Sequence, residues 1–360
     1  MVTRIGVLTS GGDCPGLNAA IRAIVHKAVG TYGWRVFGIK KGTTGLISRP
    51  LDYIELTTTM CDTALMRTGG TFLGSTNKDN PFYFPLQNGG HVDRSEDFFA
   101  GYRELNLDAL IAIGGDGSMK ILKRLSDLGQ LNLVTIPKTI DNDVSGTENA
   151  IGYLTAVSVA TEALDRLQPT AASHQRVMIL EVMGRDAGHI ALASGIAGGA
   201  DVILIPEISY TLDKIYEKIN SLAVHGSNFA LIIVAEGVKK EDGQPIKVAD
   251  PKTGRLRYGG IGHYLSEKMS LATGAETRVT VLGHVQRGGQ PCAEDRILAS
   301  KFGVGAVDLI YSGKFNQMVA LENQRITSVS IEEAVASQKV VSQSGTMMKT
   351  ARGLGICFGD

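Results

Sequence analysis

Short apolar runs alternate with longer amphipathic stretches along this chain. This alternation is typical of strand–helix units that build a mainly parallel sheet with helices on its faces. The expected strands are Ile5–Leu8, Ala109–Ile113, Leu133–Ile136, Val177–Val182, Val202–Ile205 and Leu231–Ala235. The expected helices are Leu17–Val29, Ser118–Leu128, Gly152–Leu167, Leu212–Leu222 and Glu294–Tyr311. Because 360 residues correspond to about two domains, we predict an α/β protein with two Rossmann-like, three-layer αβα domains.

The charge balance excludes several classes of protein. The 36 Lys and Arg residues equal the 36 Asp and Glu residues in number, which argues against a chain that coats nucleic acid or anionic lipid. No apolar run reaches the roughly 18–20 residues of a membrane span, and no signal-peptide pattern is present. The four cysteines lie far apart and form no CxxC pair, so we expect a reducing, cytoplasmic setting.

Glycine is in excess, with 44 of 360 residues, and a first group of glycines follows the first expected strand. In GVLTSGGDCPGLNAAIR, Gly11 and Gly12 turn the chain before a helix that begins near Gly16. Backbone N–H groups at such a turn can face an anion, because glycine has no Cβ to block a phosphate. The turn is neither a Walker A motif nor GxGxxG, and a simple tight turn remains the alternative.

A second glycine-rich turn, IAIGGDGSMK, follows the strand expected at Ala109–Ile113. Its glycines surround one carboxylate, Asp116. Mg²⁺ on nucleotide phosphates is usually held by only one or two carboxylates, so Asp116 is the predicted metal ligand. The alternative is that Asp116 only caps the helix near Ser118. Because GGDG occurs in more than one kinase family, it indicates a kinase without naming the substrate.

A third loop, IPKTIDNDVSGTENAIG, places Asp141 and Asp143 two residues apart. In phosphoryl transfer, one carboxylate can accept the proton of the acceptor hydroxyl. Either aspartate suits that role, and a loop that only caps the next helix is the alternative.

Arginines dominate the second half of the motif set. Four of them sit at or just beyond apolar runs: Arg176, Arg185, Arg278 and Arg287. Guanidinium groups pair bidentately with phosphate, so the group predicts a site for an anionic acceptor, with surface salt bridges as the alternative. We expect His284 to contact phosphate rather than act as a base, and Glu236 to accept hydrogen bonds from sugar hydroxyls.

Taken together, these segments closely resemble the 6-phosphofructokinase family of the bacterial type. The matching segments run in family order from residue 4 to about residue 300: GVLTSGGDCPGLNAAIR, GGTFLGS, GGDGS, PKTIDND, HQR, EVMGR, IAGGAD, AEG, ETR and LGHVQRGG. The combination of TIDND with MGR and GHxQRGG is highly specific. The resemblance implies the phosphofructokinase fold. It also implies Mg²⁺-dependent transfer of a phosphoryl group to the 1-hydroxyl of fructose 6-phosphate in glycolysis, giving fructose 1,6-bisphosphate.

The resemblance also implies roles for individual residues. Catalysis is assigned to Asp141, as general base, with Arg185, Thr139 and Lys138. The donor site comprises Gly11, Gly12, Asn77, Lys78, Gly115, Asp116, Gly117 and Ser118, with Asp116 as the Mg²⁺ ligand. The substrate site comprises Thr139, Ile140, Asp141, Arg176, Met183, Gly184, Arg185, Glu236, Arg278, His284, Val285, Gln286 and Arg287.

The same resemblance predicts how the chain is divided and assembled. Arg176 and Arg278 would reach the sugar phosphate from a neighbouring subunit, so we expect a homodimer or homotetramer with shared active sites. We assign residues 1–150, with roughly 260–312, to a donor domain. Residues 151–259, with 313–360, form the predicted sugar-phosphate domain.

Two positions bear on the phosphoryl donor. Gly117 leaves room for a nucleotide, whereas a second aspartate there goes with pyrophosphate in the family. Lys138 precedes TIDND, and Gly117 with Lys138 resembles a mixed group of ATP and pyrophosphate enzymes. Many relatives carry an arginine after FLGS, but this chain has Thr76, Asn77 and Lys78 there. We expect ATP as the donor, with ADP and pyrophosphate left open.

Other interpretations remain. Another GGDG kinase, acting on NAD or a diacylglycerol, would lack TIDND and the arginine set. A non-catalytic sensor of nucleotide and sugar phosphate on the same fold would need no Asp141, Asp116 or Arg185. The polar stretch Lys239–Tyr258 is expected to be a surface loop, or else a flap over the site. The C-terminal tail is expected to pack on the second domain, because Leu354, Ile356 and Phe358 are apolar.

Overall fold

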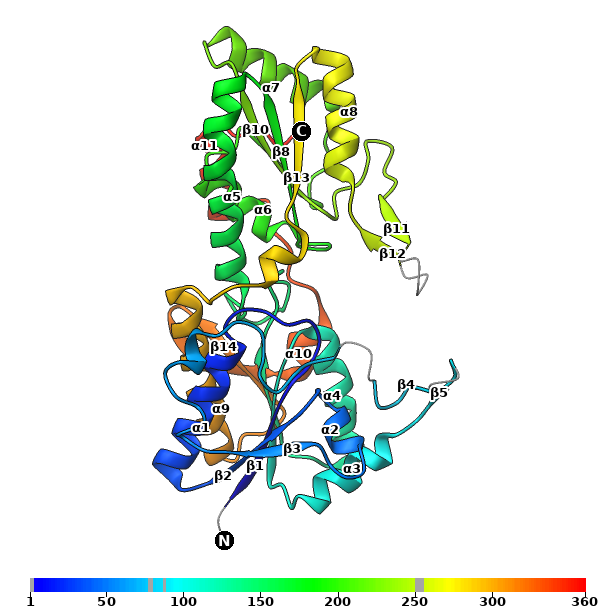
Figure 1. Cartoon of the computed structure of the whole chain (residues 1–360), viewed down its shortest axis with the longest axis vertical. Coiled ribbons are helices and arrows are strands. Elements are labelled where there is room, and N and C mark those ends of the chain that lie inside the picture. Colours follow the sequence, from blue (N-terminus) through cyan, green and yellow to red (C-terminus); the bar gives the residue numbers. More distant parts are fainter. Residues whose placement is uncertain (1–2, 77–79, 87–88, 250–255) are drawn as a thin grey trace. The chain divides into compact units, whose positions relative to one another are not determined.

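The computed structural model describes residues 3–76, 80–86, 89–249 and 256–360. The chain divides into two compact units, each visible in Figure 1: Met1–Leu154 with Arg287–Gln338, and Thr155–Gln286 with Lys339–Asp360. Each contains a mainly parallel sheet flanked by helices, so the predicted α/β class is confirmed.

In the first unit, seven of the described strands form one sheet. Across the sheet they are β15 (Arg325–Ser330), β14 (Gln317–Glu322), β7 (Leu133–Pro137), β6 (Ala109–Gly114), β1 (Arg4–Thr9), β2 (Arg35–Ile39) and β3 (Tyr53–Leu56). The central strands from β14 to β2 run parallel, and β15 and β3 are antiparallel edges. β6 and β7 are buried along their whole length, as expected for parallel strands that are covered on both faces.

Helices form the outer layers of this unit. They are α1 (Leu17–Tyr32), α2 (Thr44–Ile47), α3 (Ser95–Glu104), α4 (Asp116–Gly129), α9 (Ala293–Tyr311) and α10 (Ile331–Ala336), with the 3₁₀ turn η1 (Leu65–Arg67). In Figure 1, α1 and α9 lie on one side of the strands, and α2, α3 and α4 lie on the other. The short strands β4 (Phe84–Pro85) and β5 (His91–Val92) pair separately.

The second unit has a smaller parallel sheet. Across it lie β13 (Thr277–Val281), β8 (Val177–Val182), β10 (Ala230–Ala235) and β9 (Val202–Leu204). Its helices are α5 (Tyr153–His174), α6 (His189–Ala197), α7 (Leu212–Val224), α8 (Ile261–Thr273) and α11 (Thr346–Gly353). The antiparallel strands β11 (Lys247–Ala249) and β12 (Leu256–Tyr258) form a separate pair, and the 3₁₀ segment η2 (Gly283–Arg287) follows β13.

Two predicted segment assignments are corrected. The sequence placed residues 260–286 in the first domain, but β13 pairs with β8 of the second unit. The sequence placed residues 313–338 in the second domain, but β14 pairs with β7 of the first unit. Sheet pairing over long sequence separations decides both assignments, and such pairings leave no local signal.

The C-terminal tail packs on the second unit, as predicted. The Ile203 N–H donates to the Cys357 carbonyl at 2.9 Å, and the Cys357 N–H donates to the Asp201 carbonyl at 3.0 Å. Phe358 is buried, whereas Leu354 is 65% exposed. The tail therefore pairs with β9 through its backbone, and of the apolar side chains on which the prediction was based, Phe358 is buried and Leu354 is not.

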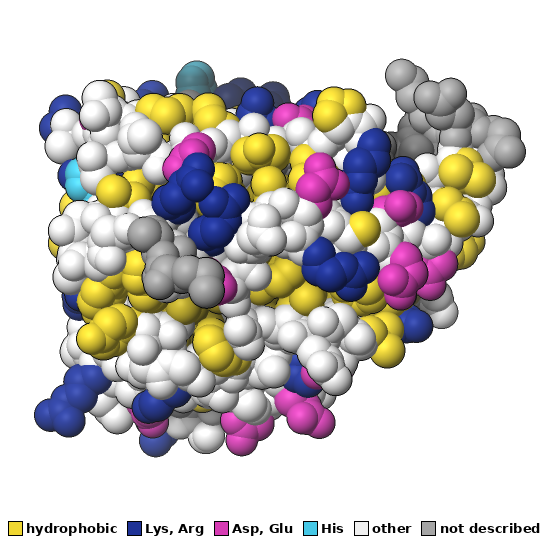
Figure 2. Space-filling view, turned by 90° about the horizontal axis from the view of Figure 1, so that it is seen from below, with side chains coloured by type: hydrophobic (Ala, Val, Ile, Leu, Met, Phe, Trp, Pro, Cys, Tyr) yellow, Lys and Arg dark blue, Asp and Glu magenta, His cyan; other side chains and the backbone are white. Residues whose placement is uncertain are grey.

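On the face seen in Figure 2, the basic side chains of Lys and Arg lie among the acidic side chains of Asp and Glu. This agrees with the formal net charge of zero. Among the described residues, no helix is long and apolar enough to cross a membrane.

Helices α1 and α9 approach each other closely through a glycine. A Cβ at Gly303 of α9 would lie 2.7 Å from the Ala20 carbonyl oxygen and 2.8 Å from the Ala23 Cβ, both on α1. A Cβ at Gly30 of α1 would meet nothing within 4 Å. The two helical glycines therefore differ in whether a methyl group has room.

We expect Gly303→Ala to lower the free energy of unfolding by about 1–3 kcal/mol, because the added methyl group overpacks the contact between helices. Gly30→Ala is the matched control and should raise it by about 0.5–1 kcal/mol, since alanine favours the helix. Urea denaturation of both variants measures the difference. Equal stability of the two variants would contradict the close contact between α1 and α9.

Candidate functional site

Three predicted turns of the first unit meet at one edge of its sheet. They follow β1, β6 and β7, which are adjacent and parallel. The Lys138 N–H donates to the Gly114 carbonyl at 2.9 Å. A Cβ at Gly11 would lie 3.1 Å from the Ser118 Oγ and 3.4 Å from the Lys138 Nζ. The structure therefore brings together residues from all three turns, as expected at the carboxyl ends of parallel strands.

A hollow of about 670 Å³ opens beside these turns. It is lined by Gly11–Asp13, Gly69–Thr71 and Gly74–Thr76. The Gly11 N–H donates to the Thr76 carbonyl at 2.9 Å, which ties the first turn to the Gly74–Thr76 segment. A concave hollow with so much glycine in its walls lets a ligand approach the backbone closely.

Asn18 of α1 holds the GGTFLGS segment in place, a role that the sequence did not reveal. Asn18 is buried. Its Nδ2 donates to the Thr68 carbonyl at 3.0 Å, and its Oδ1 accepts from the Phe72 N–H at 3.0 Å. The sequence could have revealed this role, because Asn18 lies among apolar residues of an expected helix, and a buried asparagine needs hydrogen-bond partners.

Asp116 is the first residue of α4, at the positive end of the helix dipole. Its carboxylate is 41% exposed and lies 3.5 Å from the Lys120 Nζ. A Cβ at Gly117 would meet nothing within 4 Å, so the space beside Asp116 is open. The predicted donor residues Asn77 and Lys78 lie outside the described residues.

The described residues include no group of three or more His, Cys, Asp and Glu side chains that could hold a metal ion. The donor set here is a single accessible carboxylate next to glycine backbone. That set fits a divalent cation that takes its other ligands from water and from a bound phosphate chain.

The two carboxylates of the third loop have different surroundings. Asp141 and Asp143 are both buried. The Asp143 Oδ2 accepts a hydrogen bond from the Gln338 Nε2 at 3.2 Å, whereas Asp141 interacts electrostatically with Lys138. Asp143 thus makes a structural contact, whereas the charge of Asp141 acts on Lys138 and raises its pKa.

Asn142 separates the two aspartates by its backbone conformation. Its φ of 54° lies in the left-handed region, which asparagine tolerates better than most residues. Its Oδ1 accepts from the Ala150 N–H at 3.0 Å, and its Nδ2 donates to the Glu148 carbonyl at 3.1 Å. These bonds fix the loop conformation that holds Asp141.

Two cations converge on the turn at Gly12. Lys138 is 4% exposed, and its Nζ donates to the Gly12 carbonyl. Burial lowers the pKa of Lys138, and the charge of Arg287 lowers it further. The Arg287 Nη1 donates to the Asp13 carbonyl at 3.3 Å. The two cations therefore place positive charge beside this turn. Burial raises the pKa of the neighbouring Cys14 thiol to about 12.

Arg287 contacts the turn at Gly11–Asp13, which was predicted to bind the donor, whereas the sequence analysis assigned Arg287 to the sugar site. By its contacts it belongs to the first unit. A Cβ at Gly12 would lie only 3.1 Å from its Nη1. Glycine at position 12 therefore also makes room for the guanidinium group.

In the second unit, the predicted sugar residues Arg185 and Glu236 meet at the carboxyl ends of β8 and β10. The Arg185 N–H donates to the Glu236 Oε1 at 3.3 Å. Arg185 has a φ of 50°, a left-handed conformation that costs roughly 1–2 kcal/mol for a residue with a Cβ. A Cβ at Gly237 would lie 1.8 Å from the Arg185 carbonyl oxygen, so only glycine fits beside this loop.

The residues near η2 have mixed surroundings. The Gln286 Oε1 accepts from the Met183 N–H at 2.7 Å, and Gln286 is fully buried. Gln286 therefore supports the Met183–Arg185 loop. The sequence analysis had predicted that Gln286 contacts the substrate. His284 and Val285 are exposed, as ligand-binding positions require.

Arg176 and Arg278 lie at the opposite end of the same sheet. Arg176 precedes β8, and Arg278 pairs in register with Met178 near the start of that strand. The strand separates them from Met183 by about five residues, or roughly 16 Å. Both guanidinium groups bind Glu276, whose pKa is lowered mainly by the hydrogen bond from Arg176. Within one chain, they do not join Arg185.

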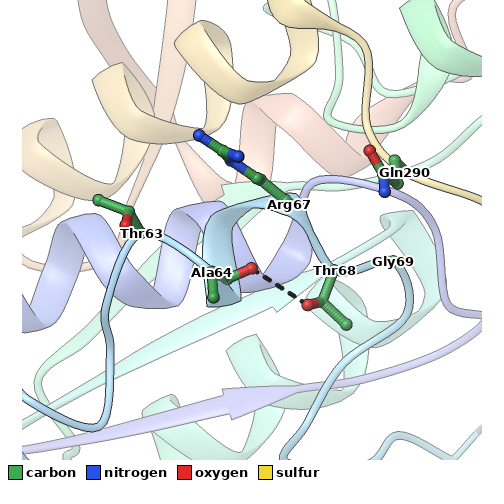
Figure 3. A pocket seen from close by; sticks show the side chains of 6 residues that line it. All are labelled: Thr63, Ala64, Arg67, Thr68, Gly69 and Gln290. Atoms are coloured by element: carbon green, nitrogen blue, oxygen red, sulfur yellow. Dashed lines mark hydrogen bonds between the residues drawn. The ribbon is translucent and has the colours of Figure 1, made fainter.

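A second hollow of about 540 Å³ adjoins the first at Gly69. Figure 3 shows the Arg67 side chain extending from η1, while the Thr68 Oγ1 donates to the Ala64 carbonyl at 3.2 Å. Thr63 and Gln290 complete its lining. Apart from Gly69, which begins the GGTFLGS segment, these lining residues were not singled out by the sequence.

Parallel sheets, a glycine-walled hollow and a buried loop carboxylate are the elements that an α/β phosphotransferase requires. The chain belongs to the phosphofructokinase family, because the family model described as "Phosphofructokinase" matches residues 4–310.

Named relatives agree with this family. The chain is 59% identical over 359 residues to "ATP-dependent 6-phosphofructokinase 1" of Synechocystis, covering 100% of this chain and 99% of that one. It is 58% identical over 357 residues to "ATP-dependent 6-phosphofructokinase 1" of Nostoc, covering 99% of each. The solved structure of Pichia pastoris phosphofructokinase in the T-state superposes with a TM-score of 0.80 and 29% identity, covering 99% of this chain and 37% of that one.

We expect Lys138→Met to leave the free energy of unfolding at neutral pH unchanged or raised, because it removes a buried charge at nearly constant volume. The folded-state pKa of Lys138 lies below its ordinary value of 10.5. The unfolded chain therefore binds more protons between the two values, and the stability of the wild type rises with pH across that window. Lys138→Met should lack this rise.

Urea denaturation of wild type and Lys138→Met at neutral and alkaline pH checks this expectation. A variant much less stable than wild type at neutral pH would show that the buried ammonium stabilises the fold. An identical pH dependence in both proteins would show that Lys138 keeps its ordinary pKa.

Proposed function

We propose that this chain is an ATP-dependent 6-phosphofructokinase that transfers a phosphoryl group to the 1-hydroxyl of fructose 6-phosphate. The product is fructose 1,6-bisphosphate, as in glycolysis. One observation carries the proposal: the carboxyl ends of β1, β6 and β7 place Asp141, Lys138 and a glycine-walled hollow at one edge. The names of relatives about 59% identical over the whole chain support the same activity.

Asp141 is the proposed general base, which takes the proton from the 1-hydroxyl as the new bond forms. General base catalysis by a positioned carboxylate contributes about 10²–10⁴-fold in rate. The fixed loop around Asn142 keeps Asp141 in position, so no reorganisation is needed at the moment of transfer. Thr139 supports the loop, because its Oγ1 accepts from the Asp141 N–H at 3.1 Å.

Lys138 and Arg185 are the proposed electrostatic catalysts. Positive groups fixed before the reaction stabilise charge that develops on the transferring phosphoryl group. The low exposure of Lys138 strengthens its effect, because little water screens it.

The first unit is the proposed donor unit. Gly11, Gly12, Gly115, Gly117 and Ser118 supply backbone and hydroxyl contacts to the donor phosphates. A divalent metal is required for this class of reaction, and we take it to be Mg²⁺, held by Asp116. When bound, Mg²⁺ neutralises charge on the donor phosphates.

The second unit is the proposed sugar-phosphate unit. Its proposed sugar-binding residues are Met183, Gly184, Arg185, Glu236, His284 and Val285. Ile140 and Arg287 are the proposed sugar-binding residues of the first unit. Arg176 and Arg278 are proposed to bind the sugar phosphate of a neighbouring subunit, so the enzyme is a homodimer or homotetramer. Their place at the far end of the sheet from Arg185 supports this sharing.

The remaining alternatives differ in donor or in chemistry. ADP or pyrophosphate would use the same turns, and a non-catalytic sensor would bind both ligands without turnover. The open space at Gly117 favours a nucleotide, because an added carboxylate there would repel its phosphates.

We expect Asp141→Asn to lower turnover with fructose 6-phosphate by about 10² or more, with sugar binding largely kept. The matched control is Asp143→Asn, which retains an oxygen for the Gln338 contact and should stay within about threefold of wild type. A coupled assay measures turnover, and calorimetry measures sugar binding. An equal loss in both variants would remove Asp141 from its special role.

We expect the wild type to use ATP better than ADP or pyrophosphate when the three are compared at matched Mg²⁺. Gly117→Asp should raise the KM for ATP about tenfold or more, because the new carboxylate faces the donor space. Gly353→Asp places the same change at another open helical glycine and should leave the KM unchanged. Preference of the wild type for pyrophosphate would overturn the donor assignment.

A further inference from the structure

The polar stretch Lys239–Tyr258 is exposed at most of its positions of described burial, as expected for a surface loop, and two of its side chains contact the second unit. At its start, the Glu241 Oε1 accepts from the Leu212 N–H at 3.0 Å, at the first residue of α7. Near its end, β12 pairs with β11, with Lys247 opposite Tyr258. The ammonium of Lys247 lies 5.0 Å from the Tyr258 ring centre.

Tyr258 reaches the loop that carries Arg185. Its hydroxyl donates to the Asp186 Oδ1 at 2.6 Å, a short bond typical of a charged acceptor. This hydrogen bond is the main cause that raises the pKa of Tyr258 to about 12, and the charges of Glu236 and Arg185 also act on it. The hydroxyl therefore stays protonated at neutral pH and can donate.

The backbone that follows Tyr258 is fixed to the strand that leads into the same loop. Glu181 of β8 is 2% exposed. Its carboxylate accepts from the Gly260 N–H at 3.0 Å and from the Gly262 N–H at 2.9 Å. Gly260 has a φ of 99°, which turns the chain from β12 into α8. The base of Tyr258 is therefore anchored to β8, and its hydroxyl is bonded just beyond the end of β8.

We propose that Tyr258 is a positioning residue for Arg185, which it acts on through Asp186. Arg185 holds a left-handed backbone conformation that is unfavourable by itself, and Asp186 is the next residue. A bond from an anchored tyrosine to Asp186 opposes relaxation of this loop. The inference rests on the proposed function, in which the Arg185 guanidinium stabilises transferring charge.

The first test is Tyr258→Phe, which removes the hydroxyl and keeps the ring. We expect kcat to fall about tenfold, the effect of one charge-assisted hydrogen bond, while the KM for fructose 6-phosphate changes less than about threefold. The matched control is Tyr216→Phe, since the Tyr216 hydroxyl donates to the Lys268 carbonyl at 3.2 Å in the same unit. The control should keep wild-type kcat. A kcat for Tyr258→Phe within twofold of wild type would overturn the proposal.

The second test asks whether Tyr258 acts through Asp186. Asp186→Asn keeps an acceptor oxygen and should retain more kcat than Asp186→Ala. The double variant Tyr258→Phe/Asp186→Ala should lose no more than Asp186→Ala alone. Multiplying losses in the double variant would show that the two residues act independently and would overturn the proposal.

A third readout separates this proposal from the proposed function. Amide hydrogen exchange of residues 183–188 should be faster in Tyr258→Phe than in wild type, and unchanged in Tyr216→Phe. If the wild type transfers no phosphoryl group to fructose 6-phosphate from any donor, the proposed function fails, and exchange still decides whether Tyr258 holds the loop. Unchanged exchange in Tyr258→Phe would overturn the positioning role.

Discussion

The parallel alignment of β1, β6 and β7 is the constraint on which the site of the first unit depends. Adjacent parallel strands end at the same edge, so the turns that follow them must share one small volume. Glycine is needed there because three backbone segments and the ends of two cationic side chains crowd together. A Cβ at Gly11 would crowd Ser118 and Lys138, and a Cβ at Gly12 would crowd Arg287.

That crowding has an energetic consequence at Lys138. Burial of an ammonium group removes its hydration and destabilises the charged form, and the pKa of Lys138 is lowered for this reason. A core designed only for stability would place an apolar side chain at this position. The carbonyl of Gly12 and the charge of Asp141 offset part of the cost, so the arrangement fits the proposed binding of donor phosphates.

The sequence predicted most of the fold because its strands carry local signals. The expected strand at Val177–Val182 matches β8 in both ends, and the helix expected at Leu212–Leu222 matches α7 within two residues. The positions of segments 260–286 and 313–338 could not be predicted, since they depend on pairing with strands far away in the sequence. The same reason hid Tyr258, whose partner Asp186 lies 72 residues earlier. Motifs name the residues of a site, but contacts between distant segments decide which residues hold them in place.

The pair Arg176 and Arg278 shows how such a contact changes the interpretation of a motif. Two guanidinium groups repel each other, and Glu276 lies between them with hydrogen bonds to both. The carboxylate therefore keeps the two cations together at the start of β8 and β13 in the absence of another anion. The phosphate that we propose for these arginines would meet side chains that are already ordered, which would reduce the loss of side-chain entropy on binding. From the sequence alone, HQR and ETR are two separate basic motifs, whereas the parallel pairing of β8 and β13 brings their arginines together at Glu276.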